Sequence, residues 1–196
     1  MTTLYVACGI PGSGKSTTFR SIKEIVDNVR KNTFEIVSRD AIRFAKLREN
    51  KNIQYFDKEK EVWKEYVDTI QKYLDEKIDF VFAVGGGSAI DSSKAIREFA
   101  LKINNYGKVG LIAIPTTSGT GSEVTSFAVV NDTAAHVKYP LISDSLTADE
   151  AILDAELVKS VPPSITADTG MDVFTHALES YVSTAHNEFS SALAEK

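Results

Sequence analysis

The sequence contains one cysteine, Cys8, so no disulfide can form within the chain. Such sparse use of cysteine is typical of proteins from a reducing cytoplasm. No apolar run approaches the roughly twenty residues that span a membrane. Met1 leads directly into a strand-like segment, without the basic and apolar regions of a signal peptide. We therefore expect a cytoplasmic protein that contacts no membrane.

The chain also lacks an excess of positive charge. Its 22 lysines and arginines stand against 27 aspartates and glutamates, which gives a net charge of −5. A dedicated nucleic-acid-binding protein is usually basic, so the charge argues against that class. The 196 residues, 43% of them hydrophobic, suffice for one sizeable core or two small ones.

The segment at residues 79–88, Asp-Phe-Val-Phe-Ala-Val-Gly-Gly-Gly-Ser, organises the rest of the chain. A short apolar run bounded by turn residues is typical of a buried parallel strand. Glycines between a strand and a helix expose backbone N–H groups, which suit an anion such as phosphate. From the glycines alone, a plain tight turn is the alternative.

Apolar runs of strand length alternate with helical patterns along the chain. This alternation predicts an α/β fold, three-layer and doubly wound, with a mostly parallel sheet of about four or five strands. The expected parallel strands are residues 4–8, 34–37, 80–84, 110–114 and 151–154. A short β-hairpin is expected at 127–141, turning around Asn131 and Asp132, and a C-terminal helical piece after Pro162 and Pro163. A long helix from about residue 58 has an expected buried stripe of Val62, Tyr66, Val67, Ile70, Tyr73 and Leu74.

Residues 9–17 match the P-loop pattern, Gly-x-x-x-x-Gly-Lys-Ser, between a strand and a helix. Lys15 would reach the β- and γ-phosphates, and the Ser16 hydroxyl would ligate Mg²⁺. The predicted residues for ATP phosphate and Mg²⁺ binding are Gly9, Gly12, Ser13, Gly14, Lys15, Ser16 and Thr17. An ordinary glycine turn is the alternative, and the full spacing argues against it.

The P-loop, the Ser-Arg-Asp-x-x-Arg cluster at 38–43 and the long helix that contains Trp63 resemble the P-loop kinases of the polynucleotide-kinase type. The resemblance covers about residues 1–82. It implies that Asp40 is the general base on an acceptor hydroxyl and that Arg43 positions the acceptor, a polynucleotide or a small hydroxyl compound. A helix N-cap with a surface charge is the alternative for these two residues. Val84 stands where that family has an aspartate that organises Mg²⁺.

Residues 81–196 resemble the iron-containing (group III) alcohol dehydrogenases. Three motifs carry the resemblance: Gly-Gly-Gly-Ser-x-x-Asp-x-x-Lys, Ile-Pro-Thr-Thr-x-Gly-Thr-Gly-Ser-Glu and Thr-Gly-Met-Asp-x-x-Thr-His-Ala-x-Glu. It implies that the glycines and the serine of the first motif, residues 85–88, hold the pyrophosphate of NAD(P). It also implies that threonines of the second motif line the cofactor cleft and that Lys138 reaches the nicotinamide ribose. The implied cofactor residues are Gly85, Gly86, Gly87, Ser88, Asp91, Thr116, Thr117, Thr120 and Lys138.

Asp172 and His176 lie four residues apart and therefore share one helix face, a spacing that suits a divalent metal. Carboxylate and imidazole favour Fe²⁺ or Zn²⁺, and a surface Asp–His pair is the alternative. The resemblance implies that they are the first two of four metal ligands, the others being histidines of later helices. His136 and His186 stand outside those motifs and are expected to face solvent. We therefore expect an incomplete site that binds metal weakly.

These patterns divide the chain into a kinase-like part at 1–82, a dehydrogenase-like nucleotide-binding part at 83–163, and the start of a truncated metal-binding helical part at 164–196. Three interpretations follow. The first is a fragment or hybrid related to iron-dependent alcohol dehydrogenase, which transfers hydride between an alcohol or aldehyde and NAD(P). The second is an ATP-dependent phosphotransferase, and the third a non-catalytic chimera, engineered or artefactual. Apolar residues of the C-terminal helix, left uncovered, would invite homodimerisation.

Overall fold

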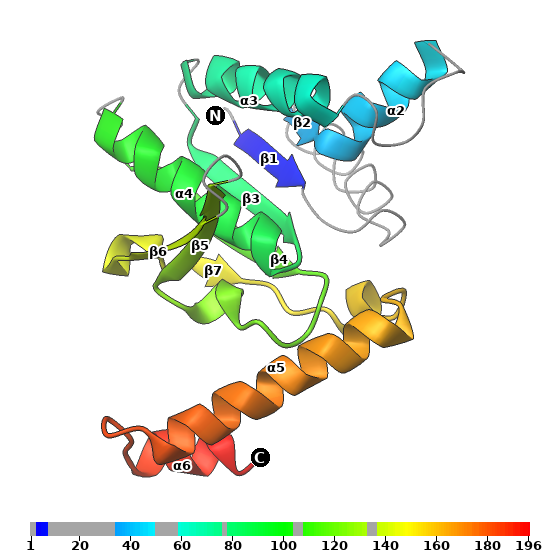
Figure 1. Cartoon of the computed structure of the whole chain (residues 1–196). Coiled ribbons are helices and arrows are strands. Elements are labelled where there is room, and N and C mark those ends of the chain that lie inside the picture. Colours follow the sequence, from blue (N-terminus) through cyan, green and yellow to red (C-terminus); the bar gives the residue numbers. More distant parts are fainter. Residues whose placement is uncertain (1–2, 8–33, 50–58, 76–77, 104–107, 133–136) are drawn as a thin grey trace.

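The computed structural model describes residues 3–7, 34–49, 59–75, 78–103, 108–132 and 137–196. Within these ranges, five parallel strands form the main sheet, in the order β2-β1-β3-β4-β7. They are β1 (Thr3–Ala7), β2 (Phe34–Ser38), β3 (Phe80–Gly85), β4 (Gly110–Pro115) and β7 (Glu150–Ala151). The predicted α/β class with a mostly parallel sheet is confirmed, and Figure 1 shows β3 and β4 at its centre.

The strand order places a topological switch point between β1 and β3. Counted along the chain, the order is 2-1-3-4-5, and open sheets of this order bind ligands at the carboxyl ends of the two strands on either side of the switch. Ala7, the last residue of β1, pairs with Val84 near the end of β3. Both strands therefore end at the same edge of the sheet, so this edge is where a ligand is expected.

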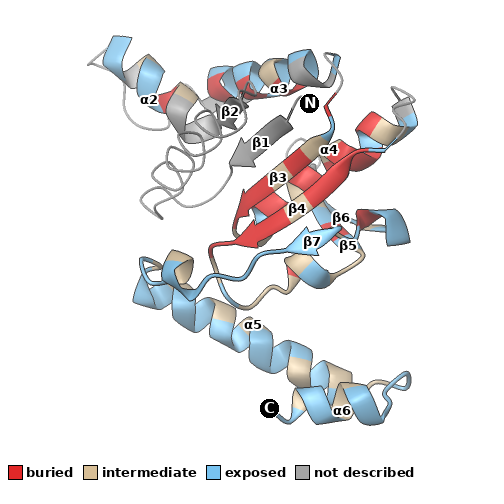
Figure 2. Ribbon diagram, turned by 180° about the vertical axis from the view of Figure 1, so that it is seen from behind, coloured by how far each residue is buried: buried red, intermediate tan, exposed pale blue. Residues whose placement is uncertain are grey.

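Helices α2 (Arg39–Glu49), α3 (Glu59–Asp75) and α4 (Gly87–Ile103) connect these strands. Tyr66 and Ile70 of α3 share one buried cluster with Ile90 of α4, Val81 of β3 and Leu111 of β4. The core therefore lies between the central strands and these two helices, and Figure 2 shows β3 and β4 as largely buried.

The predicted stripe of α3 is confirmed at Val62, Tyr66 and Ile70, which are buried. Val67 was predicted to be buried, and this is wrong: it is 53% exposed, because it lies on the solvent face next to the stripe. The side chains of Tyr73 and Leu74 lie outside the described residues, as does the helix expected after the P-loop.

A two-stranded antiparallel sheet of β5 (Phe127–Asp132) and β6 (Val137–Ile142) forms the predicted hairpin. The turn was predicted at Asn131 and Asp132, but both residues belong to β5, where they pair with Lys138 and Val137. The strand predicted at 151–154 is also shorter than expected. Glu150 and Ala151 form the strand paired with β4. The Ile152 N–H still donates to the Ala113 carbonyl oxygen across 2.9 Å, but Leu153 and Asp154 are not part of the strand.

The chain ends in α5 (Pro163–Val182) and α6 (Glu188–Ala194), which pack against each other away from the main sheet (Figure 1). Pro163 at the first position of α5 fits the preference of proline for a helix start. Asn187 caps α6 by accepting hydrogen bonds from the backbone N–H groups of Phe189 and Ser190. No helix in the described ranges has both the length and the apolar character to cross a membrane.

Candidate functional site: the carboxyl edge of the sheet

Two loops meet where β3 and β4 end. Gly85 of β3 pairs with Pro115 of β4, so the segments that follow these residues leave the sheet side by side. We call residues 85–88 the glycine turn and residues 116–121 the threonine loop. The Thr116 N–H donates to the Gly85 carbonyl oxygen across 2.9 Å, which ties the start of the loop to the start of the turn.

Threonine side chains lie directly against the glycines of the turn. A Cβ atom at Gly86 would come 3.1 Å from the Thr117 hydroxyl oxygen, and one at Gly87 only 2.9 Å from the Thr120 methyl carbon. Any side chain at Gly87 would therefore push Thr120 away. The predicted cofactor residues Gly86, Gly87, Thr117 and Thr120 are thus brought together in one place.

The start of α4 is suited to an anion. The first N–H groups of a helix lack acceptors one turn earlier and carry the positive end of the helix dipole. The first turn of α4 contains no acidic residue that would repel a negative charge. Ser88, in this first turn, is exposed. Phosphate oxygens could therefore approach these amides without a Cβ in the way.

Asp91 was predicted to belong to the cofactor site, and the structure gives its carboxylate contacts within the chain. The Ser122 hydroxyl donates to Asp91 Oδ1, and the backbone N–H of Val129 donates to Asp91 Oδ2 across 3.0 Å. Ser122 opens the short helix η1 (Ser122–Val124) that follows the threonine loop. Asp91 therefore fastens the segment after the loop to α4.

Lys94, one turn further along α4, is completely buried. Its ammonium group donates to the carbonyl oxygens of Thr125 and Phe127, each across 2.7 Å, and to the Thr125 hydroxyl across 3.2 Å. Removal from water lowers the pKa of this ammonium group, and the nearby Asp91 carboxylate opposes that shift. Sequence reasoning assigned Lys94 no role, because a lysine on a helix is normally a solvated charge.

The hairpin of β5 and β6 extends from this region toward the N-terminal end of α4. β5 passes Lys94 at Phe127 and then Asp91 at Val129, so it runs toward the N-terminal end of α4. Lys138, predicted to reach the nicotinamide ribose, pairs with Asn131 further along this strand and is exposed. The structure thus puts Lys138 on the part of the hairpin that continues toward the glycine turn.

The tip of the threonine loop meets α5. Gly119 has a φ of 146°, and a Cβ atom there would lie 2.5 Å from the carbonyl oxygen of Thr169. Only glycine allows this approach without strain. The contact connects the carboxyl edge of the sheet to the helix that carries Asp172 and His176.

Asp172 and His176 lie on one face of α5, as predicted. Asp172 Oδ1 and His176 Nε2 are 3.7 Å apart, and their side chains are 45% and 53% exposed. Among the described residues, no three His, Cys, Asp or Glu side chains gather in a way that could hold a metal ion. Protein zinc sites use at least three protein ligands, so this exposed pair does not fit a resident iron or zinc ion. His186 is exposed beyond α5, as expected.

Only part of the kinase-like segment lies among the described residues. The P-loop residues, Gly9 to Thr17, and His136 lie outside the described residues. Asp40 is the second residue of α2, so a helix does begin at this cluster. Arg43 is 3% exposed, so the surface-charge alternative is wrong for this residue. Val84 is fully buried at the end of β3 and offers no carboxylate to Mg²⁺.

Known proteins resemble the chain over most of its length. Residues 14–155 match the iron-containing alcohol dehydrogenase family, and residues 166–196 match the C-terminal part of that family. The 1-propanol dehydrogenase of Citrobacter freundii is 57% identical over 122 residues, which make up 60% of this chain and 32% of that protein. The NADPH-dependent butanol dehydrogenase of Clostridium saccharobutylicum is 42% identical over 132 residues, 59% of this chain and 34% of that protein.

A solved structure gives the same result. The sulfoacetaldehyde reductase of Bifidobacterium kashiwanohense, determined in complex with NAD⁺, superposes with a TM-score of 0.71 at 30% identity. The superposition covers 98% of this chain and 49% of that one, so the chain spans about half the length of this relative. The family match begins at residue 14, within the segment that resembles a kinase, and that resemblance stays a prediction. By these matches the chain belongs to the iron-containing alcohol dehydrogenase family.

Proposed function

We propose that the chain binds NAD(P) at the carboxyl edge of its sheet, with the pyrophosphate on the glycine turn. This proposal depends on one observation: the side chains of Thr117 and Thr120 pack against Gly86 and Gly87 at the start of α4. There, helix amides face the strand ends beside the switch point between β1 and β3.

The reaction that this site would serve is hydride transfer between NAD(P) and a small alcohol or aldehyde. Relatives named for 1-propanol and butanol favour a short primary alcohol as the substrate class. Bound NAD(P) would supply the hydride acceptor or donor. The residues of this chain would bind and orient the cofactor: helix amides for the pyrophosphate, the threonine loop beside it and Lys138 near the ribose. Because Asp172 and His176 do not fit a resident metal ion, we derive no step through iron.

Calorimetric titration of the 196-residue chain with NADH, compared with a Gly87→Ala variant, tests this proposal. The added methyl group would displace Thr120 from the turn, so we expect binding to weaken about tenfold or more. Gly170→Ala is the matched control. A Cβ atom at Gly170 in α5 meets no heavy atom within 4 Å, so this variant should bind NADH like the unchanged chain.

Two results of these titrations would contradict the proposal in different ways. If the unchanged chain binds no NADH or NADPH, the proposed function is wrong. If it binds and Gly87→Ala binds equally well, the nucleotide lies elsewhere. Circular dichroism of both variants establishes whether any loss of binding reflects unfolding.

A second candidate function is binding of ATP and Mg²⁺ by the P-loop. The observation that favours it is the register of β1, whose last residue, Ala7, pairs with Val84 at the same sheet edge. The strand before the P-loop therefore ends beside the strand before the glycine turn. With Asp40 and Arg43 as the predicted acceptor residues, the reaction would be phosphoryl transfer to a polynucleotide or a small hydroxyl compound. Because Val84 stands where a carboxylate would organise Mg²⁺, this candidate favours ATP binding without phosphoryl transfer, as in a non-catalytic hybrid.

Titration with Mg–ATP tests this candidate. Lys15→Ala should abolish binding, because the P-loop lysine contacts the β- and γ-phosphates. Lys108→Ala, which removes an exposed lysine between α4 and β4, is the control. If titration with Mg–ATP gives no heat of binding, or if Lys15→Ala binds Mg–ATP as tightly as the unchanged chain, ATP binding by the P-loop is ruled out.

A further inference from the structure

Two charged residues on successive turns of α4 hold the chain that follows the threonine loop. Asp91 accepts hydrogen bonds from the Ser122 hydroxyl and the Val129 amide, and Lys94 donates to Thr125 and Phe127. Asp91 and Lys94 are three residues apart, so they lie on the same face of the helix. We call this set of contacts the α4 clamp.

The clamp is continuous with the proposed nucleotide site. The backbone N–H of Ser122 donates to the Thr120 hydroxyl across 3.3 Å, and the Thr120 side chain rests against Gly87, the first residue of α4. A chain of contacts therefore begins at Asp91, passes through Ser122 and Thr120, and returns to the start of the same helix. Displacing Ser122 would release Thr120 from the glycine turn.

Burial excludes direct contact between most of the clamp and a ligand. Lys94 is fully buried and Ser122 is 5% exposed. All three donor positions of the Lys94 ammonium are directed at protein oxygens, and both Asp91 oxygens accept from the protein. These groups can act on a bound nucleotide only through the loop that they fasten.

We propose that Asp91 and Lys94 are positioning residues, which hold the threonine loop in its nucleotide-binding shape before the nucleotide arrives. This inference rests on the proposed NAD(P) site. A loop of this kind, rich in glycine, loses much conformational freedom when it is ordered. A clamp that orders the loop in advance removes that cost from the binding step, so its loss weakens affinity without removing any contact to the ligand.

Ser122→Ala is the sharpest test, because it deletes one hydroxyl and leaves the charges of the clamp in place. Ser145→Ala is its matched control: the Ser145 hydroxyl donates to Glu98 of α4 across 2.6 Å, on the part of the helix away from the glycine turn. Each variant thus loses one serine hydrogen bond to a carboxylate of the same helix. We expect Ser122→Ala to weaken NADH binding about five- to tenfold and Ser145→Ala to leave it unchanged.

Amide hydrogen exchange shows whether the effect is confined to the loop, because general destabilisation would speed exchange throughout the chain. Without nucleotide, residues 117–125 should exchange about tenfold faster in Ser122→Ala than in the unchanged chain, and saturating NADH should largely restore their protection. Asp91→Asn provides a second variant. An uncharged amide replaces one acceptor oxygen by a donor, so the bonds to Ser122 and Val129 lose their charge assistance and NADH binding should weaken as well.

Equal NADH affinities of the unchanged chain, Ser122→Ala and Asp91→Asn would overturn the inference while leaving the nucleotide site intact. Equal weakening by Ser122→Ala and Ser145→Ala would also overturn it, because the effect would then be general destabilisation. Failure of the unchanged chain to bind NADH would instead overturn the proposed function itself, and this inference with it.

Discussion

Gly119 is the residue through which the threonine loop, at the carboxyl edge of the sheet, packs against α5. A methyl group there would collide with the Thr169 backbone and would occupy a φ of 146° that L-residues rarely adopt. We predict that Gly119→Ala destabilises the chain by about 2–3 kcal/mol and loosens α5.

Thermal unfolding and limited proteolysis near the start of α5 measure this effect. Gly121→Ala is the control, because Gly121 has a φ of 61° but a Cβ atom there meets no heavy atom within 4 Å. It should cost only the backbone strain, about 1 kcal/mol. Equal losses in the two variants would mean that the contact with Thr169 contributes nothing.

Glu98 makes the stability of the folded chain depend on pH under acidic conditions. Hydrogen bonds from Lys102 and Ser145 lower the pKa of this carboxyl group in the folded chain. A carboxyl group whose pKa is lower in the folded chain than in the unfolded chain contributes its full stabilisation of the fold above the unfolded pKa, about 4. This contribution is lost as pH falls through the pKa of the folded chain.

We therefore predict that Glu98→Gln is less stable than the unchanged chain at pH 7, and that the difference narrows steadily below about pH 4. Urea unfolding at several pH values measures it. A difference in stability that stays constant from pH 7 down to pH 3 would contradict the assigned role of Glu98.

Some of these residues were within reach of sequence reasoning and others were not. The glycine turn and its threonines stand in motifs next to predicted strands, so their meeting at one edge could be predicted. Asp91 and Lys94 stand in the same motif, but their partners lie more than thirty residues away along the chain. A helix pattern does not reveal whether a lysine is solvated or buried, because burial depends on the loop that covers it.

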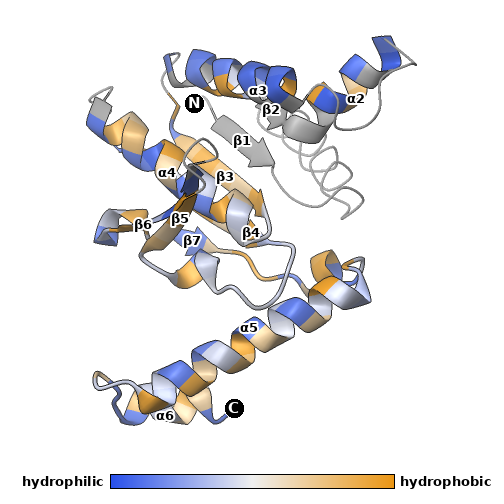
Figure 3. Cartoon of the chain, in the orientation of Figure 1, coloured by the Kyte–Doolittle hydropathy of each residue, from blue (hydrophilic) through white to orange (hydrophobic). Residues whose placement is uncertain are grey.

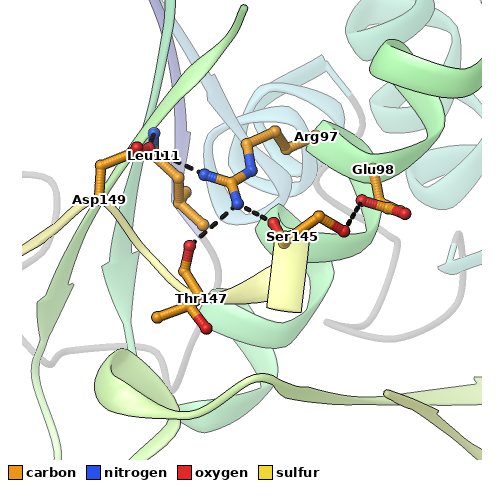
Figure 4. Close-up of polar contacts among 6 residues, drawn as sticks. All are labelled: Arg97, Glu98, Leu111, Ser145, Thr147 and Asp149. Atoms are coloured by element: carbon orange, nitrogen blue, oxygen red, sulfur yellow. Dashed lines mark hydrogen bonds and ion pairs between the residues drawn. The ribbon is translucent and has the colours of Figure 1, made fainter. Parts of the chain in front are cut away.

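At the scale of elements, Arg97 joins α4 to the segment that leads into the edge strand β7 (Figure 4). Its guanidinium group donates to Asp149 across 2.9 Å and to the carbonyl oxygens of Ser145 and Thr147. The same Asp149 oxygen accepts from the backbone N–H of Leu111 in β4 across 2.8 Å. Arg97 therefore fixes the segment between η2 (Asp144–Leu146) and β7.

Arg97→Ala should destabilise the chain by about 2–4 kcal/mol, because it leaves three acceptors without their donor and opens a cavity. Lys102→Ala is the control: Lys102 pairs with Glu98 on the same helix, but its side chain is 69% exposed, so its loss should cost less than about 1 kcal/mol. Chemical denaturation measures both. A loss below about 1 kcal/mol in Arg97→Ala would show that the guanidinium group does not hold this segment.

The elements that the sequence predicted best are those with a strong apolar period. The central strands and α3 fall within a few residues of their expected bounds. β7 was overestimated, because the apolar residues Ile152 and Leu153 look like a strand although they are 46% and 70% exposed and lie outside the paired ladder. The Ile152 N–H still donates to the Ala113 carbonyl oxygen of β4, but the strand ends at Ala151. The hairpin turn was misplaced because Asn and Asp favour turns locally, whereas pairing with β6 continues through both residues.

At the scale of the whole molecule, the C-terminal helices are the least covered part. Figure 3 shows hydrophobic residues along α5, and the helix contains no buried residue. Met171, Phe174 and Val182 are each more than 60% exposed. Homodimerisation through this face stays a prediction, as the sequence suggested.

The Asp172–His176 pair should bind divalent metal only weakly. Two ligands supply roughly half of the 10–16 kcal/mol of a four-ligand zinc site, which corresponds to a dissociation constant between about 1 μM and 1 mM. Zn²⁺ titration by calorimetry measures it, and His176→Ala should abolish the binding. His186→Ala, which removes the exposed histidine after α5, is the control. Nanomolar binding, or an equal loss in both variants, would contradict the two-ligand site.

We propose above all that the glycine turn and the threonine loop form one nucleotide site at the carboxyl edge of the sheet. A crystal structure of the 196-residue chain grown with NAD⁺ tests it most directly. We expect pyrophosphate oxygens within hydrogen-bonding distance of the backbone N–H groups of residues 86–88, with Thr117 or Thr120 alongside. Nucleotide density at any other edge of the molecule, with the glycine turn empty, would contradict it.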